Sequence, residues 1–115
     1  MTITVYHNPR CSKSRATLQL LTERGMEPQV INYLDTPPNR AELEHILQLL
    51  GLQPRELMRR QETEYTELGL GNPALGRDEL INAMVEHPRL IERPIVIHGN
   101  QAVIGRPPEK VLEIL

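Results

Sequence analysis

The chain has 115 residues, 39% of them hydrophobic, which is the size and apolar content of one folded domain. Its formal net charge of -2 provides no basic field for nucleic acid, and with no Trp, no Phe and three Tyr it lacks a surface for stacking bases. The single cysteine excludes a disulfide within the chain, and the sequence shows no hydrophobic span or signal peptide. We therefore expect a cytoplasmic protein with no nucleic-acid partner and no membrane partner.

The N-terminal part of the chain predicts a strand, a helix and a second strand. Apolar residues alternate at Ile3 and Val5, and a helical apolar pattern follows from Ser14 to near Gly25. Residues 29–33 predict the second strand. Strand, helix and strand in this order are typical of a right-handed βαβ unit.

The middle of the chain predicts a block of helices. Asn39 is an expected N-cap because Glu42 stands three residues later, and an apolar stripe continues until Gly51. A short helix is expected over residues 54–60, and another over residues 78–87. This block separates the βαβ unit from the C-terminal part.

The C-terminal part predicts a hairpin and a last helix. Residues 94–98 and 101–105 are apolar runs on either side of the turn signal Gly99-Asn100. A final helix is expected to start at Pro107. The complete order predicts an α/β fold with a four-stranded mixed sheet and flanking helices, in which a helical insertion lies between the βαβ half and the C-terminal ββα half.

Cys11 lies at or just before the first predicted helix and is a candidate nucleophile. Backbone N–H groups at a helix start favour an anion there. Cationic or potentially cationic side chains stand within four positions of the sulfur, namely His7, Arg10, Lys13 and Arg15. Both effects favour the thiolate form. The alternative is that Cys11 is a small buried hydrophobic residue, as many free cysteines are.

Two arginines are expected to face one another at the open end of the predicted hairpin. With Gly99-Asn100 as the turn, Arg93 is opposite Arg106. Opposed like charges destabilise a strand pair unless an anion lies between them, and a guanidinium can bind a tetrahedral oxyanion through two parallel hydrogen bonds. The alternative is a pair of solvated arginines. Arg59 and Arg60, near the end of a predicted helix, are weaker candidates because cations are favourable there without a ligand.

Several other kinds of site are disfavoured by the spacing of residues. The four histidines show no metal-ligand spacing and no second cysteine accompanies them, so we expect no metal. No Gly-rich phosphate loop or dinucleotide fingerprint is present. Ser14 stands where a second redox cysteine of a C-x-x-C motif would be, so any redox cycle needs an external thiol. Thr17 occupies the position where a cysteine-dependent phosphatase has its arginine.

The chain resembles a known family in five ordered motifs. They are Tyr6-His7-Asn8-Pro9-x-Cys11-x-x-Ser14-Arg15, Tyr33-Leu34-x-Thr36-Pro37-Pro38, Glu67-Leu68-Gly69-Leu70, Ile91-x-Arg93-Pro94-Ile95-Val96 and Arg106-Pro107-x-Glu109. Together they resemble the glutaredoxin-coupled arsenate reductases of the ArsC family over essentially the whole chain. The resemblance implies a single thioredoxin-like domain over residues 1–115.

The resemblance also implies roles for individual residues. Cys11 is similar to the nucleophile that attacks arsenate. The residues similar to the family's oxyanion-binding arginines are Arg59, Arg93 and Arg106. The residues expected to support the thiolate are His7, Ser14 and Arg15. The Arg93-Pro94 bond is similar to the cis proline beside the active cysteine in thioredoxin-like folds.

The mechanism that the resemblance implies needs no bound cofactor. The thiolate would form an adduct with arsenate, glutathione would attack this adduct as co-substrate, and glutaredoxin would resolve the product. Two alternatives remain. The chain could be a family oxidoreductase acting on another oxyanion or on a glutathionylated thiol, or it could be a binding module similar to the Spx-type transcription regulators.

Overall fold

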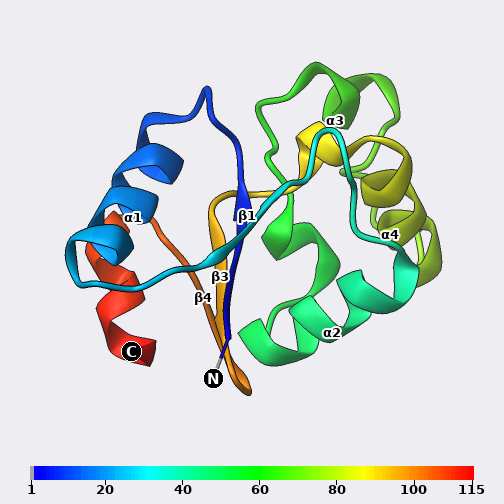
Figure 1. The fold of residues 1–115 in the computed structure, drawn as a ribbon. Helices are drawn as coiled ribbons and strands as arrows, with labels where there is room; N and C mark the ends of the chain where they lie inside the picture. The colour runs from blue at the N-terminus through cyan, green and yellow to red at the C-terminus, as the bar shows by residue number, and fades with distance from the viewer. Residues whose placement is uncertain (1) are drawn as a thin grey trace. The chain divides into compact units, whose positions relative to one another are not determined.

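Four strands form one mixed sheet in the computed structural model, which describes residues 2–115 (Figure 1). They are β1 (Ile3–His7), β2 (Gln29–Asn32), β3 (Ile95–His98) and β4 (Gln101–Ile104). The order across the sheet is β2-β1-β3-β4, with β1 parallel to β2 and the other two pairs antiparallel. The predicted four-stranded mixed sheet is confirmed.

The chain forms two compact units, which we name the sheet unit and the helical unit. The sheet unit runs to Thr36 and resumes with Arg93–Leu115, and the helical unit is Pro37–Glu92. The helical unit is therefore the insertion that the sequence predicts between the two halves of the sheet. The inserted segment begins at Pro37, and Pro94 follows two residues after its end at Glu92.

In the sheet unit, one face of the sheet is covered by α1 (Ser12–Glu23) and by the 3-10 helix η3 (Pro108–Ile114) (Figure 1). The residues of the core on this face are Ile3, Val5, Leu21, Val96, Val111 and Ile114. Residues two apart on a strand point to the same face, which explains why Ile3 and Val5 both enter this core. The apolar stripe of α1 thus fixes its N-terminus beside the end of β1.

The helical unit contains α2 (Arg40–Leu50), the 3-10 turn η1 (Pro54–Leu57), α3 (Thr63–Glu67), α4 (Arg77–Glu86) and the 3-10 turn η2 (Pro88–Leu90). Its buried side chains include Leu43, Ile46, Leu47, Leu57, Leu80, Ile81, Met84 and Leu90. Ion pairs link α2 to the start of α4, one between Arg40 and Asp78 and one between Arg77 and Glu44. The predicted capping box of Asn39 and Glu42 is present.

Three predicted helices differ from those in the structure. The expected helix over residues 54–60 ends as a single turn at Leu57, because Met58 leaves the turn to form an isolated β-bridge with Ile91. The last predicted helix is a 3-10 helix, and the first predicted helix begins two residues earlier than expected. In addition, the structure contains the short helix α3, which was not predicted because five residues are too few for an apolar period to show.

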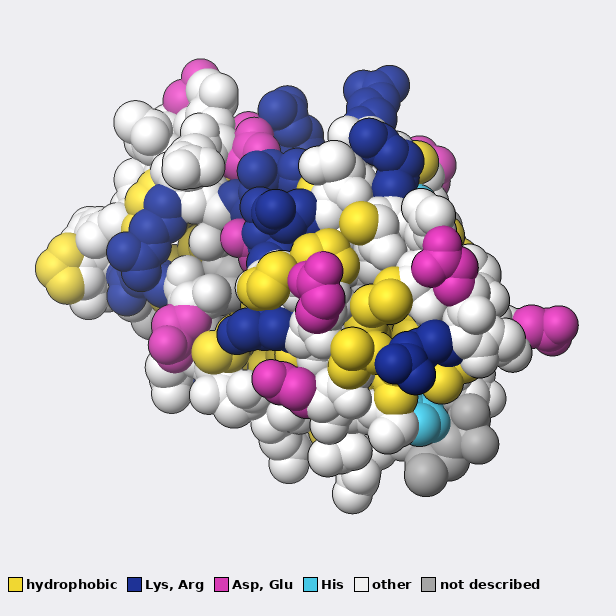
Figure 2. Space-filling model, turned by 90° about the vertical axis from the view of Figure 1, so that its left-hand side faces the viewer, with side chains coloured by type: hydrophobic (Ala, Val, Ile, Leu, Met, Phe, Trp, Pro, Cys, Tyr) yellow, Lys and Arg dark blue, Asp and Glu magenta, His cyan; other side chains and the backbone are white. Residues whose placement is uncertain are grey.

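Figure 2 shows the face on the α1 side, where Lys and Arg side chains form separate patches among acidic and apolar ones. This scatter agrees with the formal net charge of -2. Among residues 2–115, we find no helix whose length and apolar character would allow it to cross a membrane.

Gly105, directly after β4, lies too close to two side chains for a larger residue. A Cβ there would lie 2.5 Å from Thr17 Oγ1 and 2.9 Å from Pro94 Cγ. We predict that Gly105→Ala lowers the free energy of unfolding by about 1–3 kcal/mol, because a packed interior must shift to admit the methyl group. Denaturant unfolding measures this. Adding Thr17→Ala should restore part of the loss, and a double variant no more stable than Gly105→Ala would contradict the steric cause.

Candidate active site

Cys11 is the N-cap of α1 and is partly exposed. Its backbone is extended, with φ -93° and ψ 122°, and its thiol makes no capping hydrogen bond. Its N–H donates to the carbonyl of Asn8 at 3.0 Å, and its carbonyl accepts from Arg15 N–H at 3.0 Å. The sulfur therefore stands at the positive end of a twelve-residue helix, as the sequence predicts.

Asn8 shapes the loop that presents Cys11. Besides its carbonyl contact, its side-chain Oδ1 accepts from Arg10 N–H at 3.0 Å. This closes an Asx turn over Asn8, Pro9 and Arg10, a conformation that Asn adopts readily. The dipeptide Asn8-Pro9 is a common turn signal, so this role of Asn8 could have been predicted from the sequence.

Ser14 and His7 form a buried pair below the cysteine loop. The side chain of Ser14 is fully buried, and His7 is 8% exposed. Ser14 Oγ lies 2.6 Å from His7 Nδ1 and accepts from Asn8 N–H at 3.1 Å. The pair connects the end of β1 to the first turn of α1, and it brings together two of the residues expected to support the thiolate.

The charge of His7 is set by its surroundings. Burial, and to a smaller extent the positive charge of Arg15, lower the pKa of His7 from its ordinary value of 6.5. The neutral imidazole is therefore favoured at pH 7. His7 is a potential cation by residue type, but its burial favours the neutral form, which contacts the cysteine loop through Ser14.

The lowered pKa of His7 predicts how stability depends on pH. Because the unfolded chain protonates His7 more readily than the folded chain does, the contribution of neutral His7 is complete above about pH 6.5 and is lost as the pH falls below that value. We expect the difference in unfolding free energy between the wild type and His7→Gln to shrink from pH 7.5 to pH 5. Urea unfolding across this range measures it, and a difference that is constant or grows toward pH 5 would contradict the prediction.

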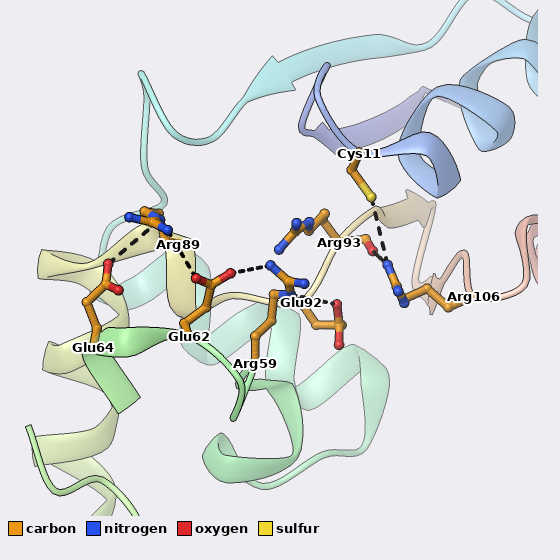
Figure 3. A network of polar contacts seen from close by, with 8 residues as sticks. All are labelled: Cys11, Arg59, Glu62, Glu64, Arg89, Glu92, Arg93 and Arg106. Carbon is orange, nitrogen blue, oxygen red and sulfur yellow. Dashed lines mark hydrogen bonds and ion pairs between the residues drawn. The ribbon is translucent and has the colours of Figure 1, made fainter. Parts of the chain in front are cut away.

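Arg106 reaches the thiol from the end of the hairpin. Its Nη1 donates to Cys11 Sγ at 3.8 Å and to the carbonyl of Arg93 at 3.2 Å (Figure 3). The observed register pairs His98 with Gln101 and Val96 with Val103, as predicted. The register thus brings Arg106 beside Arg93.

Arg93 begins the segment that leads into β3. Its side chain extends away from the Arg106 guanidinium, so the two like charges do not stack at the open end of the hairpin (Figure 3). The Arg93-Pro94 peptide bond is cis, as the family resemblance suggests, and Arg106-Pro107 is cis as well.

Arg15 is exposed, and its Nη1 donates to the carbonyl of Pro9 at 2.9 Å. It therefore holds the loop before Cys11 through a backbone contact. Lys13 and Arg10 are also exposed on the surface around this loop. These cations give the start of α1 a positive environment, which favours an anion there.

Arg59 belongs to the helical unit and is largely buried. It forms an ion pair with Glu62, and its Nε lies 3.6 Å from Glu92 Oε1. The three-residue spacing of Arg59 and Glu62 is a sequence signal for the first of these ion pairs, and Glu92 is too far along the chain to be predicted from spacing. The role of Arg59 as a third oxyanion-binding arginine stays a prediction.

The arrangement in the sheet unit can support nucleophilic chemistry on an anion. A partly exposed thiol, a helix start and a guanidinium group meet at one place. Donors and charges of this kind stabilise a thiolate and the negative charge on a tetrahedral oxyanion. Among the residues described, no three His, Cys, Asp or Glu side chains are grouped as metal ligands would be.

Known proteins with similar sequences cover nearly all of this chain. The model of the ArsC family matches residues 6–114. The uncharacterized protein YfgD of Escherichia coli strain K12 is 54% identical over 98% of this chain and 96% of its own length. An arsenate reductase of Neisseria meningitidis serogroup B is 51% identical over 98% of this chain and 97% of its own length.

A solved structure resembles this chain over its whole length. The arsenate reductase from Vibrio cholerae is 56% identical, superposes with a TM-score of 0.98, and is matched over 100% of this chain and 98% of its own. The thioredoxin-like fold that the resemblance implies is therefore confirmed.

Proposed function

Because this chain belongs to the ArsC family, we propose that it is an arsenate reductase. The observation that carries the proposal is the contact of Arg106 Nη1 with Cys11 Sγ, 3.8 Å long, at the start of α1. The contact places a candidate nucleophile beside a guanidinium, a group that binds tetrahedral oxyanions. In addition, about half of the residues of this chain are identical to those of proteins named arsenate reductase.

In the proposed first step, the Cys11 thiolate attacks the arsenic atom of arsenate. A sulfur–arsenic bond forms, and an arsenic–oxygen bond breaks as the oxygen leaves as water after protonation. Arg106 and Arg93 would balance the negative charge of the oxyanion and of the adduct. Free N–H groups in the first turn of α1 would add further donors.

The proposed reductants are two external thiols. Reduction of arsenic(V) to arsenic(III) takes two electrons, and a glutathione thiol attacking the adduct begins that transfer. Glutathione adds to arsenic through sulfur as a second oxygen leaves as water. The glutaredoxin thiol then attacks the glutathione sulfur, so a glutathione–glutaredoxin disulfide forms and the electron pair of the broken arsenic–glutathione bond reduces arsenic to arsenic(III). Water breaks the remaining Cys11–arsenic bond, which releases arsenite and restores the Cys11 thiol. Because Cys11 is the single cysteine of the sequence, no second thiol of the chain can complete this cycle. We propose that the reaction takes place in the cytoplasm, where these thiols are kept reduced.

The proposal is tested by measuring arsenite formation with glutathione and glutaredoxin, and with each omitted in turn. We expect turnover with both and little with either missing. Selenate, chromate and a glutathionylated peptide should be tried in parallel as substrates. Faster turnover on one of these than on arsenate would assign a different substrate to the same site.

The alternative of a binding module similar to the Spx-type regulators is less well supported. Such regulators often carry a second cysteine where this chain has Ser14. Here the Ser14 hydroxyl is fully buried and bonded to His7 and to the loop backbone, a contact that serves the thiol loop. The test is the rate of Cys11 alkylation with and without arsenate. A rate that arsenate does not lower would favour the binding module.

A further inference from the structure

A groove of about 320 Å³ lies within the helical unit, between the segment that follows α3 and one face of α4. We name it the leucine groove, because its apolar wall is formed by Leu68, Leu70 and Leu75. The first two belong to the motif Glu67-Leu68-Gly69-Leu70, which has no part in the chemistry proposed for Cys11. The volume is at the lower end of the range of about 300–1,000 Å³ for ligand pockets, so it suits one or two anchoring side chains.

The motif ends α3 in a fixed geometry. Gly69 has a φ of 63°, a left-handed conformation that favours glycine. Its N–H donates to Thr66 O at 3.1 Å, and Leu70 N–H donates to Tyr65 O at 3.0 Å, which are the two bonds of a Schellman motif. Arg55 Nε donates to Leu70 O at 3.0 Å. The apolar wall of the groove is therefore held in place by the protein itself.

This turn leaves the leucines of the wall in different surroundings. Leu70 is 4% exposed, Leu75 is half-buried and Leu68 is 46% exposed. A single exposed leucine is common in folded proteins, but Leu68 lines a groove, where an apolar side chain of a partner can contact Leu75 as well. Covering these side chains removes apolar surface from water, which favours binding.

The opposite wall of the leucine groove is negatively charged. Glu79, Ala83 and Glu86 line the groove and share one face of α4, because they are four and three residues apart. Both glutamates are exposed, and among residues 2–115 neither forms an ion pair. The adjacent Asp78 differs, since Arg40 pairs with it. The two carboxylates of the groove thus favour a cation beside them.

The end of α4 adds to this negative potential. A helix C-terminus carries a partial negative charge, which a cation relieves and a carboxylate increases. The last turn of α4 contains no basic residue and ends with Glu86, and the next residue, His87, also lines the groove. A cation beside Glu86 would therefore be attracted by the carboxylate and by the helix end together.

We infer that the leucine groove is a docking site for a segment of another protein that carries a leucine-sized apolar side chain beside lysine or arginine. Leu68 and Leu75 would contact the apolar side chain, while Glu79 and Glu86 would attract the basic one. This docking site is independent of the reaction at Cys11, because its residues all belong to the helical unit.

A second copy of this chain is a poorer occupant of the groove. Its exposed leucines near the C-terminus are Leu112 and Leu115. The exposed charged residues beside them are Glu109, Lys110 and Glu113. Two carboxylates outnumber one ammonium group there, so the glutamates of the groove would repel this segment. We therefore expect a basic partner.

The test uses short fluorescent peptides and measures their binding to the whole protein by anisotropy. One set combines lysines with leucines that are one, three or four residues apart, a second set has glutamates in place of the lysines, and a third has alanines in place of the leucines. We expect a lysine–leucine peptide to bind at least about tenfold more tightly than its counterparts, and to bind less tightly in high salt. Equal affinity across the three sets, or no binding of any lysine–leucine peptide, would overturn the inference.

Variants locate the binding on the protein. Leu68→Ala, and separately Glu79→Gln combined with Glu86→Gln, should each weaken the lysine–leucine peptide about tenfold. Leu112→Ala and Glu113→Gln are the matched controls, because they change an exposed leucine and an exposed carboxylate of the sheet unit. The controls should leave the affinity unchanged. Undiminished affinity in both groove variants, or equal losses in the controls, would overturn the inference.

Sedimentation at several protein concentrations tests the second copy as occupant. We expect the wild type and Leu68→Ala to have the same apparent mass. A wild-type dimer that Leu68→Ala dissociates would replace the basic partner by self-association and overturn the inference. Arsenite formation is a separate measurement: if the wild type forms none, the proposed function fails, whereas tight and charge-dependent peptide binding would still support the docking site.

Discussion

Replacing Cys11 by serine is expected to lower the rate of arsenite formation by more than about a thousandfold, because a serine hydroxyl is a far weaker nucleophile than a thiolate. Arg106 would still stand beside residue 11, so anion binding should survive in part. The measurement is initial-rate arsenite formation at saturating glutathione and glutaredoxin. Activity within tenfold of the wild type would contradict the proposed nucleophile.

The same substitution is expected to leave the fold intact or to stabilise it. Cys11 occupies the N-cap of α1 without making a side-chain capping bond, whereas serine is among the preferred N-cap residues. A serine Oγ can accept from the N–H of Lys13 or Ser14 and contribute up to about 1 kcal/mol. Thermal unfolding would show an equal or higher midpoint for Cys11→Ser. Lost activity with retained stability would therefore be chemical in origin, and a large drop in the midpoint would contradict the capping argument.

Replacing Arg106 by alanine is expected to lower kcat/KM for arsenate by about a hundredfold to a thousandfold, the range for loss of one donor to an oxyanion. Its Nη1 contacts both Cys11 Sγ and the carbonyl of Arg93, so the change removes a positive charge beside the sulfur and a link across the hairpin base. Steady-state kinetics on arsenate measure the effect, and the rate of Cys11 alkylation at neutral pH should fall in parallel.

Two further variants make the Arg106 result specific. Arg106→Lys keeps the charge and loses the planar fork, so we expect it to recover part of the activity. Arg24→Ala removes an exposed arginine of the same unit at the end of α1 and should leave the kinetics unchanged. Equal losses in Arg24→Ala and Arg106→Ala would point to a general effect of charge, and full activity in Arg106→Ala would exclude its proposed role.

The elements that depend on neighbouring residues were predictable from the sequence. Asn39 and Glu42 exchange the two hydrogen bonds of the expected capping box, at 2.8 Å and 3.0 Å. The turn at Gly99-Asn100 produced the expected pairing of β3 and β4. Caps and two-residue turns are local, so residues close in sequence contain the information that specifies them.

Elements whose limits depend on distant partners were predicted less well. The segment after Pro54 looks helical in sequence, yet Met58 bridges to Ile91 and Arg59 N–H bonds to Leu90 O. Because their backbone groups bond to the segment around Ile91, Met58 and Arg59 do not continue the helix. The residues around Met58 show no periodicity that would predict this distant pairing.

For the candidate site, the sequence by itself determined the position of Cys11 at a helix start, because Asn8, Pro9 and the helical pattern after them act locally. Only the tertiary structure decided which arginine meets the sulfur, since Cys11 and Arg106 are 95 residues apart and are brought together by strand pairing. It also decided that His7 favours its neutral form, because desolvation depends on the side chains that surround it in the folded protein.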